Sequence, residues 1–176
     1  RAHCTEAVKR VIEEFGVEYI KNDYNVECGV GTDYNADSAG DGLLEHNRAF
    51  LAWYKEIRER YPHVTFENCA SGGHRLEPST MELCSQASFS DAHECTSIPI
   101  IAANVQRMIK PSQSQIWAVL RAKDDIHRTY YSLISGFLGR LCISGEIFDL
   151  PQENWQIALD SIKFYDEIKH IIKDGY

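Results

Sequence analysis

The sequence has few features of a protein that binds nucleic acid or enters a membrane. Its 176 residues carry 18 Lys and Arg against 26 Asp and Glu, for a formal net charge of −8. An acidic surface repels phosphate backbones and anionic headgroups, which argues against nucleic acid and membrane surfaces as partners. No apolar run approaches the roughly 18 residues that span a bilayer, and no signal peptide is visible. A neutral or cationic small molecule is the simpler partner.

Cysteine-based sites and secretory signals are also missing. The six cysteines form no Cys-x-x-Cys pair and no Cys/His spacing typical of a zinc site, and no N-x-S/T glycosylation sequence is present. Small secreted proteins depend on disulfide frameworks, whereas these scattered cysteines indicate free thiols. We therefore expect a reducing, cytoplasmic location. Because the chain starts at Arg1, without Met, we also expect a piece of a longer protein.

Hydrophobic periodicity predicts strands and helices that alternate along the chain, and 44% hydrophobic residues can bury a real core. The expected strands are residues 19–23, 64–69, 86–90, 116–120 and 141–143. The expected helices are residues 5–15, 41–61, 98–109, 125–138 and 152–172, with a helical turn at 79–84. A polar, glycine-containing loop at 27–42 is long enough to suggest function.

This alternation predicts an α/β fold with a parallel sheet, either doubly wound or a barrel. Polar or glycine-rich segments follow successive strands, at Asp23, Cys69, Asp91, Arg121 and Ser144. A barrel gathers such strand ends on one face, which favours the barrel. A whole barrel needs about 250 residues, so we expect a partial TIM (β/α)8 barrel of about five βα units. Residues 1–176 would be one catalytic-domain fragment without its N-terminal units, and its exposed strand edges favour a homo-oligomer.

Two carboxylates stand at strand ends of this expected barrel. Asp23 closes the first strand and Asp91 follows the third, and both are expected to point into one cavity. Lys21 and Asn25 share a strand face with Asp23, because side chains alternate at period two. Two carboxylates across a small cleft suit glycoside hydrolysis. Acidic pairs in barrels also bind magnesium for enolisation or aldol chemistry. The residues alone therefore leave three interpretations open: a glycosidase pair, a magnesium site and a solvated strand end.

The turn after the second strand is a candidate ligand loop. Gly72 and Gly73 let backbone approach a ligand closely, and Arg75 can fork onto hydroxyl groups. Glu67 precedes Cys69 on the same strand face and is a candidate brace for the site. We expect His74 and His93 to form local hydrogen bonds and Trp117 to lie in a strand interior rather than under a sugar.

Three segments resemble the α-galactosidases of glycoside hydrolase family 36, in clan D. Residues 19–25 (YIKNDYN) resemble the Lys-Trp-Asp-Met-Asn segment that carries the nucleophile. Residues 66–75 (FENCASGGHR) resemble the F-E-x-C-x-x-G-G-x-R substrate loop, and residues 89–94 (FSDAHE) resemble the Ser-Asp segment of the acid/base. Residues 140–145 look like the family's closing strand, so the resemblance covers nearly the whole chain.

The resemblance implies a retaining glycosidase that acts on α-linked galactosides without metal or cofactor. Asp23 would be the nucleophile and Asp91 the acid/base. The implied sugar contacts are Lys21, Asn25, Cys69, Gly72 and Arg75. The alternatives are a galactosyl transferase of the raffinose-synthase type, with the same residues, and a non-catalytic carbohydrate-binding or packing module.

The chain departs from the family pattern at several positions. Asn22 replaces the usual Trp, Ser88 replaces a common aromatic residue, and His93 and Glu94 replace a Thr-Asp pair. The first two changes remove surfaces for sugar stacking and leave the sugar specificity open. The family's first three strands and their acidic residues are absent, so we expect this chain alone to be inactive.

Overall fold

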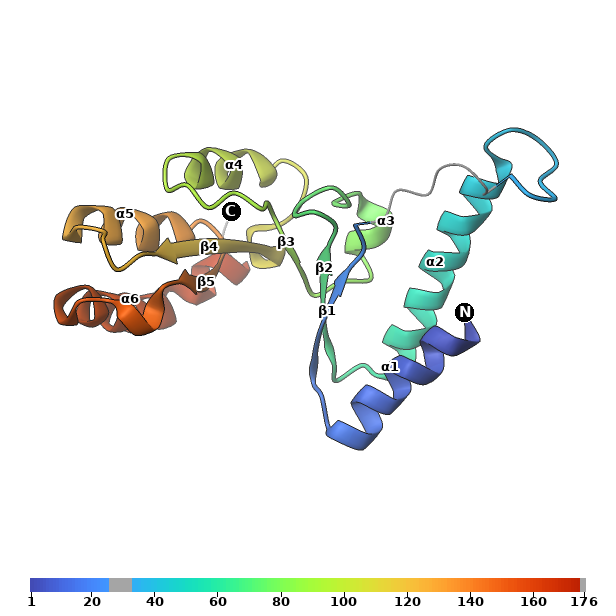
Figure 1. Ribbon diagram of the computed structural model, residues 1–176, viewed down its shortest axis with the longest axis horizontal. Helices are drawn as coiled ribbons and strands as arrows, with labels where there is room; N and C mark the ends of the chain where they lie inside the picture. The colour runs from blue at the N-terminus through green and yellow to red at the C-terminus, as the bar shows by residue number, and fades with distance from the viewer. Residues whose placement is uncertain (26–32, 175–176) are drawn as a thin grey trace.

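The computed structural model describes residues 1–25 and 33–174, in which parallel strands and helices alternate (Figure 1). The strands are β1 Tyr19–Asp23, β2 Thr65–Cys69, β3 Gln86–Ser88, β4 Ser114–Leu120 and β5 Arg140–Gly145. The helices are α1 Ala2–Phe15, α2 Asp41–Arg60, α3 Pro78–Met81, α4 Ser97–Val105, α5 Ile126–Gly136 and α6 Gln152–Asp174. Short 3-10 turns occur at η1 Pro111–Gln113 and η2 Ile147–Asp149.

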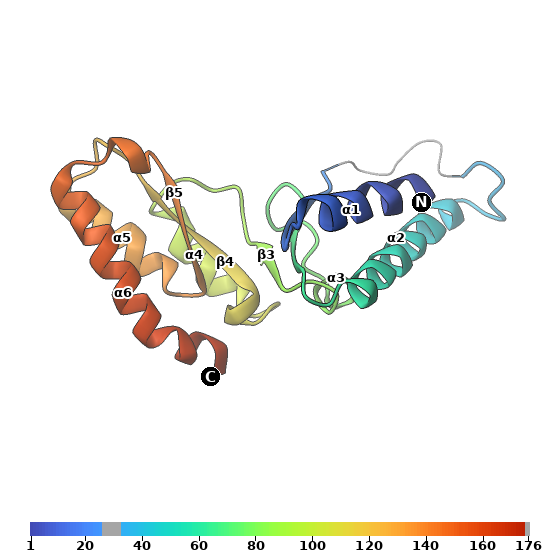
Figure 2. The ribbon, with the colours of Figure 1, turned by 90° about the horizontal axis from the view of Figure 1, so that it is seen from below.

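The sheet has the strand order β1-β2-β3-β4-β5, and every neighbouring pair is parallel. Right-handed crossovers in this sequential order place all the connecting helices on one side, as in a barrel and unlike a doubly wound sheet. Figures 1 and 2 show α1 and α2 beside β1 and β2 at one end, and α4, α5 and α6 beside β4 and β5 at the other. The expected partial (β/α) barrel is confirmed.

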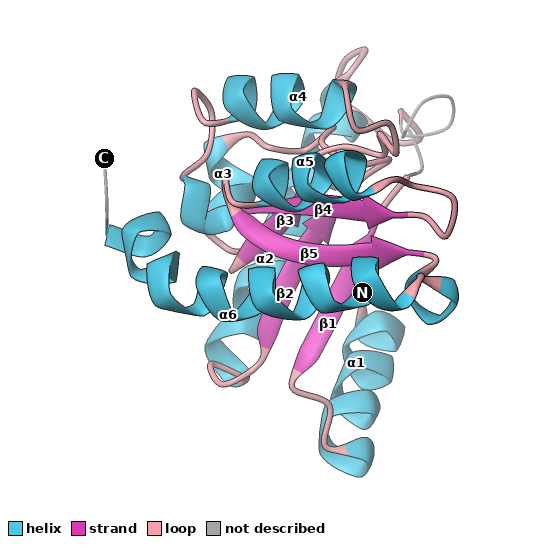
Figure 3. Cartoon of the chain, turned by 90° about the vertical axis from the view of Figure 1, so that its left-hand side faces the viewer, coloured by secondary structure: helices cyan, strands magenta, loops and turns pink. Residues whose placement is uncertain are grey.

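The two end strands, β1 and β5, each have one paired edge within the described residues (Figure 3). A closed barrel has no such edges. This sheet is therefore an arc of a barrel.

The two faces of the sheet differ in chemistry. The helix-facing side chains join two apolar clusters, a larger one around β2, β3 and the start of β4, and a smaller one between β4, α5 and α6. The larger includes Tyr54, Ile57, Phe66, Ala87, Phe89 and Ile116. The smaller consists of Ala118, Leu120, Leu133 and Ala158. Alternate positions on β1 to β4 point to the inner face and are largely polar, so the inner face is built for contacts other than apolar packing.

Glycines end two elements where the chain turns sharply. Gly16 has φ 64° after α1, and its N–H donates to the Ile12 carbonyl, as the sequence predicts. Gly145 at the end of β5 has φ 99° and lies against the Leu120 carbonyl of β4. A side chain would not fit at Gly145, since its Cβ would lie 2.1 Å from that oxygen.

The predicted boundaries need small corrections. The helix expected at 98–109 ends at Val105, and turns continue the chain to Pro111. The second helix begins at Asp41, as expected, and ends at Arg60. The first part of the expected 27–42 loop, residues 27–32 with Cys28, lies outside the described residues. The five cysteines within the described residues are free. No helix in the described ranges is long and apolar enough to cross a membrane.

Candidate active site

The ends of β1 and β2 bring the first candidate residues together. In the strand register, Lys21 lies opposite Glu67 and Asp23 lies opposite Cys69. The pairing continues one residue further, because the Tyr24 N–H donates to the Cys69 carbonyl at 2.9 Å. Asp23 and Cys69 therefore lie side by side at the carboxyl edge of the sheet, with Asp23 exposed and Cys69 buried.

Glu67 is the centre of a buried hydrogen-bond network one layer below this edge. Its side chain is only 3% exposed, and Lys21 Nζ lies 3.5 Å from its Oε1. The Ser88 hydroxyl donates to Oε1 at 2.5 Å. Oε2 accepts from the Tyr19 hydroxyl and, at 3.1 Å, from Gln115 Nε2. The expected brace is therefore present, and it joins strands β1, β2, β3 and β4.

The charges in this network stabilise each other. Burial alone would raise the pKa of Glu67, but the hydrogen bonds from Ser88 and Tyr19 and the charge of Lys21 hold it below its ordinary value. Burial would likewise lower the pKa of Lys21, but the Glu67 carboxylate outweighs it and raises that pKa. Glu67 and Lys21 are thus both ionised at neutral pH. The Glu67 carboxylate fixes the Lys21 ammonium, which lies two residues before Asp23 in the chain.

The turn after β2 forms the second part of the site. Ser71 and Gly72 both have positive φ, 45° and 75°. The Ser71 N–H donates to Asn25 Oδ1 at 2.6 Å, and Asn68 Nδ2 donates to the Arg75 carbonyl at 2.5 Å. Asn25, predicted as a sugar contact, therefore uses its carbonyl oxygen to hold this turn.

A small pocket lies between this turn and the end of β1. Its volume is about 210 Å³, and its lining residues are Tyr24, Asn25, Ala70, Ser71, His74 and Arg75. The Arg75 guanidinium stacks on the Tyr24 ring at 4.0 Å from its centroid, and Tyr24 in turn contacts His46 Nε2 at 2.7 Å through its hydroxyl. Stacking of this kind orients Arg75 over the turn.

Asp91 lies in the loop that follows β3, where its side chain is exposed. This loop touches the β2 turn directly, because a Cβ on Gly72 would lie 2.6 Å from the Asp91 backbone nitrogen. The Ser90 hydroxyl accepts from the Ala92 N–H at 2.9 Å and tightens the loop at this point. The two predicted carboxylates thus follow β1 and β3, with the β2 turn between them.

Trp117 lies inside strand β4, as the sequence predicts, and its ring contacts polar residues of the inner face. Lys21 Nζ lies 5.7 Å from the centroid of its indole ring, and the His93 ring lies 5.4 Å away. Its Nε1–H donates to Gln115, which in turn reaches Glu67. Period-two alternation from Gln115 would have indicated this placement, but the continuous apolar run around Trp117 hid it.

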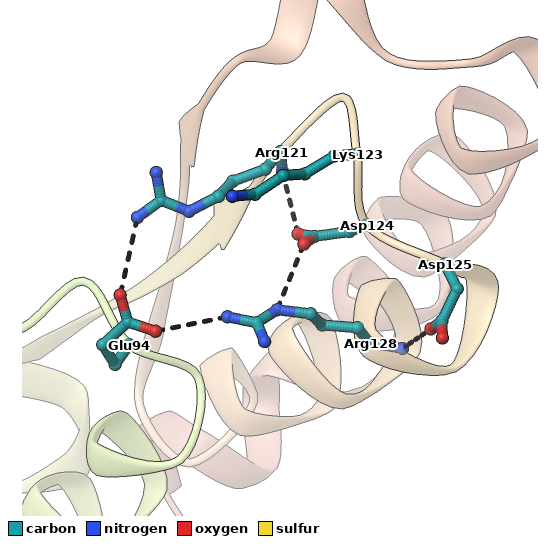
Figure 4. A pocket seen from close by; sticks show the side chains of 6 residues that line it. All are labelled: Glu94, Arg121, Lys123, Asp124, Asp125 and Arg128. Atoms are coloured by element: carbon teal, nitrogen blue, oxygen red, sulfur yellow. Dashed lines mark hydrogen bonds and ion pairs between the residues drawn. The ribbon is translucent and has the colours of Figure 1, made fainter.

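A larger, charged pocket of about 540 Å³ opens where β4 ends (Figure 4). Its lining residues are Glu94, Arg121, Lys123, Asp124, Asp125 and Arg128. Figure 4 shows Arg121 and Arg128 reaching across the pocket to Glu94, at 3.9 and 3.3 Å. Asp124 accepts from the Arg121 N–H and pairs with Arg128, at 3.0 and 3.1 Å. No group of three His, Cys, Asp or Glu side chains in residues 1–25 and 33–174 could hold a metal ion.

Comparison with known proteins places the chain in a family. A family model described as melibiase matches residues 2–175. This chain belongs to the melibiase family. The resemblance to glycoside hydrolase family 36 is thereby confirmed.

Two α-galactosidases are similar to this melibiase-family chain in sequence. One from Escherichia coli is 39% identical over 67 residues, which are 38% of this chain and 9% of that enzyme. AgaA from Geobacillus stearothermophilus is 22% identical over 189 residues, 98% of this chain and 24% of AgaA. The chain thus spans at most about a quarter of these relatives.

Solved structures agree with the barrel fold. The glycoside hydrolase family 36 α-galactosidase AgaA superposes with a TM-score of 0.81 at 18% identity, covering 96% of this chain and 24% of AgaA. The α-galactosidase of Lactobacillus brevis has a TM-score of 0.79 at 20% identity, covering 96% and 23%. Variants of AgaA have been solved in complex with stachyose and with raffinose.

The positions that depart from the family pattern have their own contacts. Ser88 donates to Glu67, and the His93 ring packs at a tilt against Trp117. The buried Asn22 amide nitrogen has no hydrogen-bond partner within the part of the chain that the structure describes.

Proposed function

We propose that this chain is part of the catalytic barrel of a retaining α-galactosidase, with Asp23 as nucleophile and Asp91 as acid/base. Residues 1–176 would then belong to one catalytic domain. The observation that supports this is the placement of both carboxylates after β1 and β3 on the carboxyl edge, in a chain that matches the melibiase family over residues 2–175. Active sites of (β/α) barrels lie at that edge.

The distance between the two carboxylates decides the stereochemistry of the reaction. Neighbouring strands lie about 4.8 Å apart, so β1 and β3 lie about 10 Å apart. A retaining reaction would require the two aspartates to lean toward each other over the β2 turn, to the separation of about 5 Å that retaining glycosidases use. A wider gap, with room for a water molecule, would give inversion instead.

The reaction would proceed in two displacements. A carboxylate oxygen of Asp23 attacks the anomeric carbon, the glycosidic C–O bond breaks, and Asp91 transfers its proton to the leaving oxygen. Asp91, now ionised, removes a proton from water, and that water attacks the anomeric carbon and releases Asp23. Both steps need only the two carboxylates and water.

The remaining site residues would bind the sugar. Lys21, fixed by Glu67, can donate to hydroxyl groups beside Asp23. Cys69 lies next to Asp23, and Gly72, Asn25 and Arg75 form the adjoining turn. We propose α-linked galactosyl oligosaccharides as substrates, of the kind bound by the AgaA variants.

The free edges of β1 and β5 would pair with the remaining strands of the barrel in the full-length protein. Those strands would supply further contacts to sugar hydroxyls. The isolated chain should therefore lack activity and self-associate through its edges.

Hydrolysis of an aryl α-galactoside by the full-length protein tests the proposal. Asp23→Asn should lower kcat/KM by about a thousandfold or more, because it removes the nucleophile. Asp160→Asn, on the exposed surface of α6, is the matched control and should leave the rate unchanged. Absence of hydrolysis, or hydrolysis unaffected by Asp23→Asn, would refute the assignment.

The same preparation separates the alternative functions. With sugar acceptors present, a transferase of the raffinose-synthase type forms a longer saccharide in place of free galactose. A non-catalytic module binds galactose in calorimetry without turnover, and Asp91→Ala leaves its affinity nearly unchanged.

A further inference from the structure

We infer that Gly73, together with Gly72 and Glu94, positions Asp91 by clamping the loop of residues 89–94 from two sides. The inference rests on the proposed function, in which Asp91 protonates the leaving oxygen. None of the three residues needs to touch the leaving group in order to act this way, since each acts through the loop. We call residues 89–94 the Asp91 loop.

The first side of the clamp is backbone packed directly on backbone. A Cβ on Gly73 would lie 2.4 Å from the Phe89 carbonyl oxygen, and one on Gly72 would lie 2.6 Å from the Asp91 nitrogen. Real Cβ atoms essentially never approach backbone so closely. Gly72 also has φ 75°, which strains any other residue, whereas Gly73 has no such constraint. At Gly73 the close contact alone therefore requires glycine.

The β2 turn that carries these glycines is itself fixed. The Ala70 N–H donates to the Gly72 carbonyl and the His74 N–H donates to the Ala70 carbonyl, both at 3.2 Å. The Asn25 and Asn68 side chains hold the turn from β1 and β2. The turn can therefore act as a wall against which the Asp91 loop rests.

The second side of the clamp is the ion-pair cluster around the charged pocket (Figure 4). Glu94, three residues after Asp91, pairs with Arg121 and Arg128. Arg128 is held by Asp124, whose side chain is 3% exposed. The Asp91 loop is thus attached to the start of α5 as well as to the β2 turn.

The contact distances set the size of the expected effect. Ordinary van der Waals contact begins at 3.4 Å, so a Cβ at 2.4 Å forces the Phe89 carbonyl back by about 1 Å. A catalytic acid has to lie within about 2.6–3.2 Å of the atom that it protonates, and a misplacement of 1 Å can cost about a hundredfold in rate. Gly73→Ala should therefore weaken acid catalysis specifically.

The test compares leaving groups in the full-length enzyme. Gly73→Ala should lower kcat/KM about a hundredfold for an unactivated α-galactosyl disaccharide, whose leaving sugar needs a proton. For a dinitrophenyl α-galactoside, which leaves without protonation, the fall in kcat/KM should be at most about threefold. With the aryl substrate kcat and KM should fall together, because a displaced Asp91 also slows attack of water on the intermediate.

Two reference variants accompany Gly73→Ala. Asp91→Ala should also lower kcat/KM more for the disaccharide than for the dinitrophenyl substrate, and the fall for the disaccharide should be larger than with Gly73→Ala. Gly16→Ala forces alanine to adopt a left-handed φ of 64°, but its Cβ would meet no atom within 4 Å. This variant therefore shows the effect of destabilisation without displacement of the Asp91 loop. It should show no dependence on the leaving group.

Equal losses on both substrates, or no loss on either, would overturn the inference. If Gly73→Ala fails to fold, Glu94→Gln decides instead. It should lower kcat/KM for the disaccharide a few-fold more than for the aryl substrate, and loss of that selectivity would equally overturn the inference. Failure of the proposed function gives a different result. Either the wild type hydrolyses neither substrate, or Asp91→Ala lowers kcat/KM equally for both substrates. The second result would refute both the assignment of Asp91 and this inference.

Discussion

Replacing Glu67 by glutamine should destabilise the protein, because the network around Glu67 needs a charged acceptor. An amide can keep one oxygen at the Oε2 position and still accept from Tyr19 and Gln115. Its NH2 group then stands at Oε1, opposite the Lys21 ammonium 3.5 Å away and the Ser88 hydroxyl. The hydroxyl can rotate and accept, but the ammonium cannot.

The variant therefore loses one charge-assisted contact in a buried place, worth about 1.5–3 kcal/mol. In a domain of this size, each kcal/mol corresponds to a shift in melting temperature of about 2–4 °C. Thermal unfolding of full-length Glu67→Gln should begin several degrees below that of wild type.

The matched control is Glu59→Gln. Glu59 also pairs with a lysine, Lys55 at 4.0 Å, but its side chain is 68% exposed. Exposed pairs of this kind contribute about 0.5 kcal/mol or less, so the melting temperature should change little.

The pH dependence gives a second readout. The folded-state pKa of Glu67 lies below its unfolded value, so its stabilisation is complete above the ordinary glutamate pKa of about 4.3 and is lost as pH falls through the folded pKa. The difference between wild type and Glu67→Gln should therefore narrow in acid. A difference that stays constant with pH, or equal melting temperatures at pH 7, would refute this account.

Three further substitutions test other parts of the fold. Gly145→Ala should prevent β5 from pairing normally with β4, since its Cβ would meet a β4 carbonyl at 2.1 Å; we expect a loss above about 3 kcal/mol or insoluble protein, measured by urea unfolding. Asp124→Asn should cost about 1–3 kcal/mol and increase hydrogen exchange at the start of α5, because it removes the charge that holds Arg128; unchanged exchange would contradict this. Leu133→Ala, at a fully buried position, should cost about 2–5 kcal/mol, whereas Ile134→Ala, at an exposed position, should cost far less; similar losses would contradict the assigned core face of α5.

The pattern of apolar residues was enough to predict most elements, but it missed the polar and glycine residues at the ends of two strands. The strand expected at 116–120 begins at Ser114. Gln115 faces the polar inner side of the sheet, where it donates to Glu67, and an apolar pattern does not describe such a residue. The strand expected at 141–143 likewise includes Arg140 and Gly145. Backbone pairing with neighbouring strands extends β4 and β5 beyond their apolar residues, and only the tertiary structure reveals those partners.

In the candidate active site, too, the sequence pattern predicts some placements and misses others. Period two already placed Lys21 and Asp23 on one strand face, and the motif around Cys69 and Arg75 indicated the ligand turn. The prediction places Trp117 in a strand but does not assign it to the inner face, since a continuous apolar run does not show which of its residues face inward.

By itself, the sequence determined the order of strands and helices and the residues that end each strand. These are local properties, set by periodicity, glycine and the polarity of neighbours along the chain. Only the tertiary structure decided that the two glycines after Cys69 press against the backbone of Asp91 and that Glu67 holds Lys21. Such contacts join segments of different strands, and they depend on strand register and backbone approach, which no local pattern encodes.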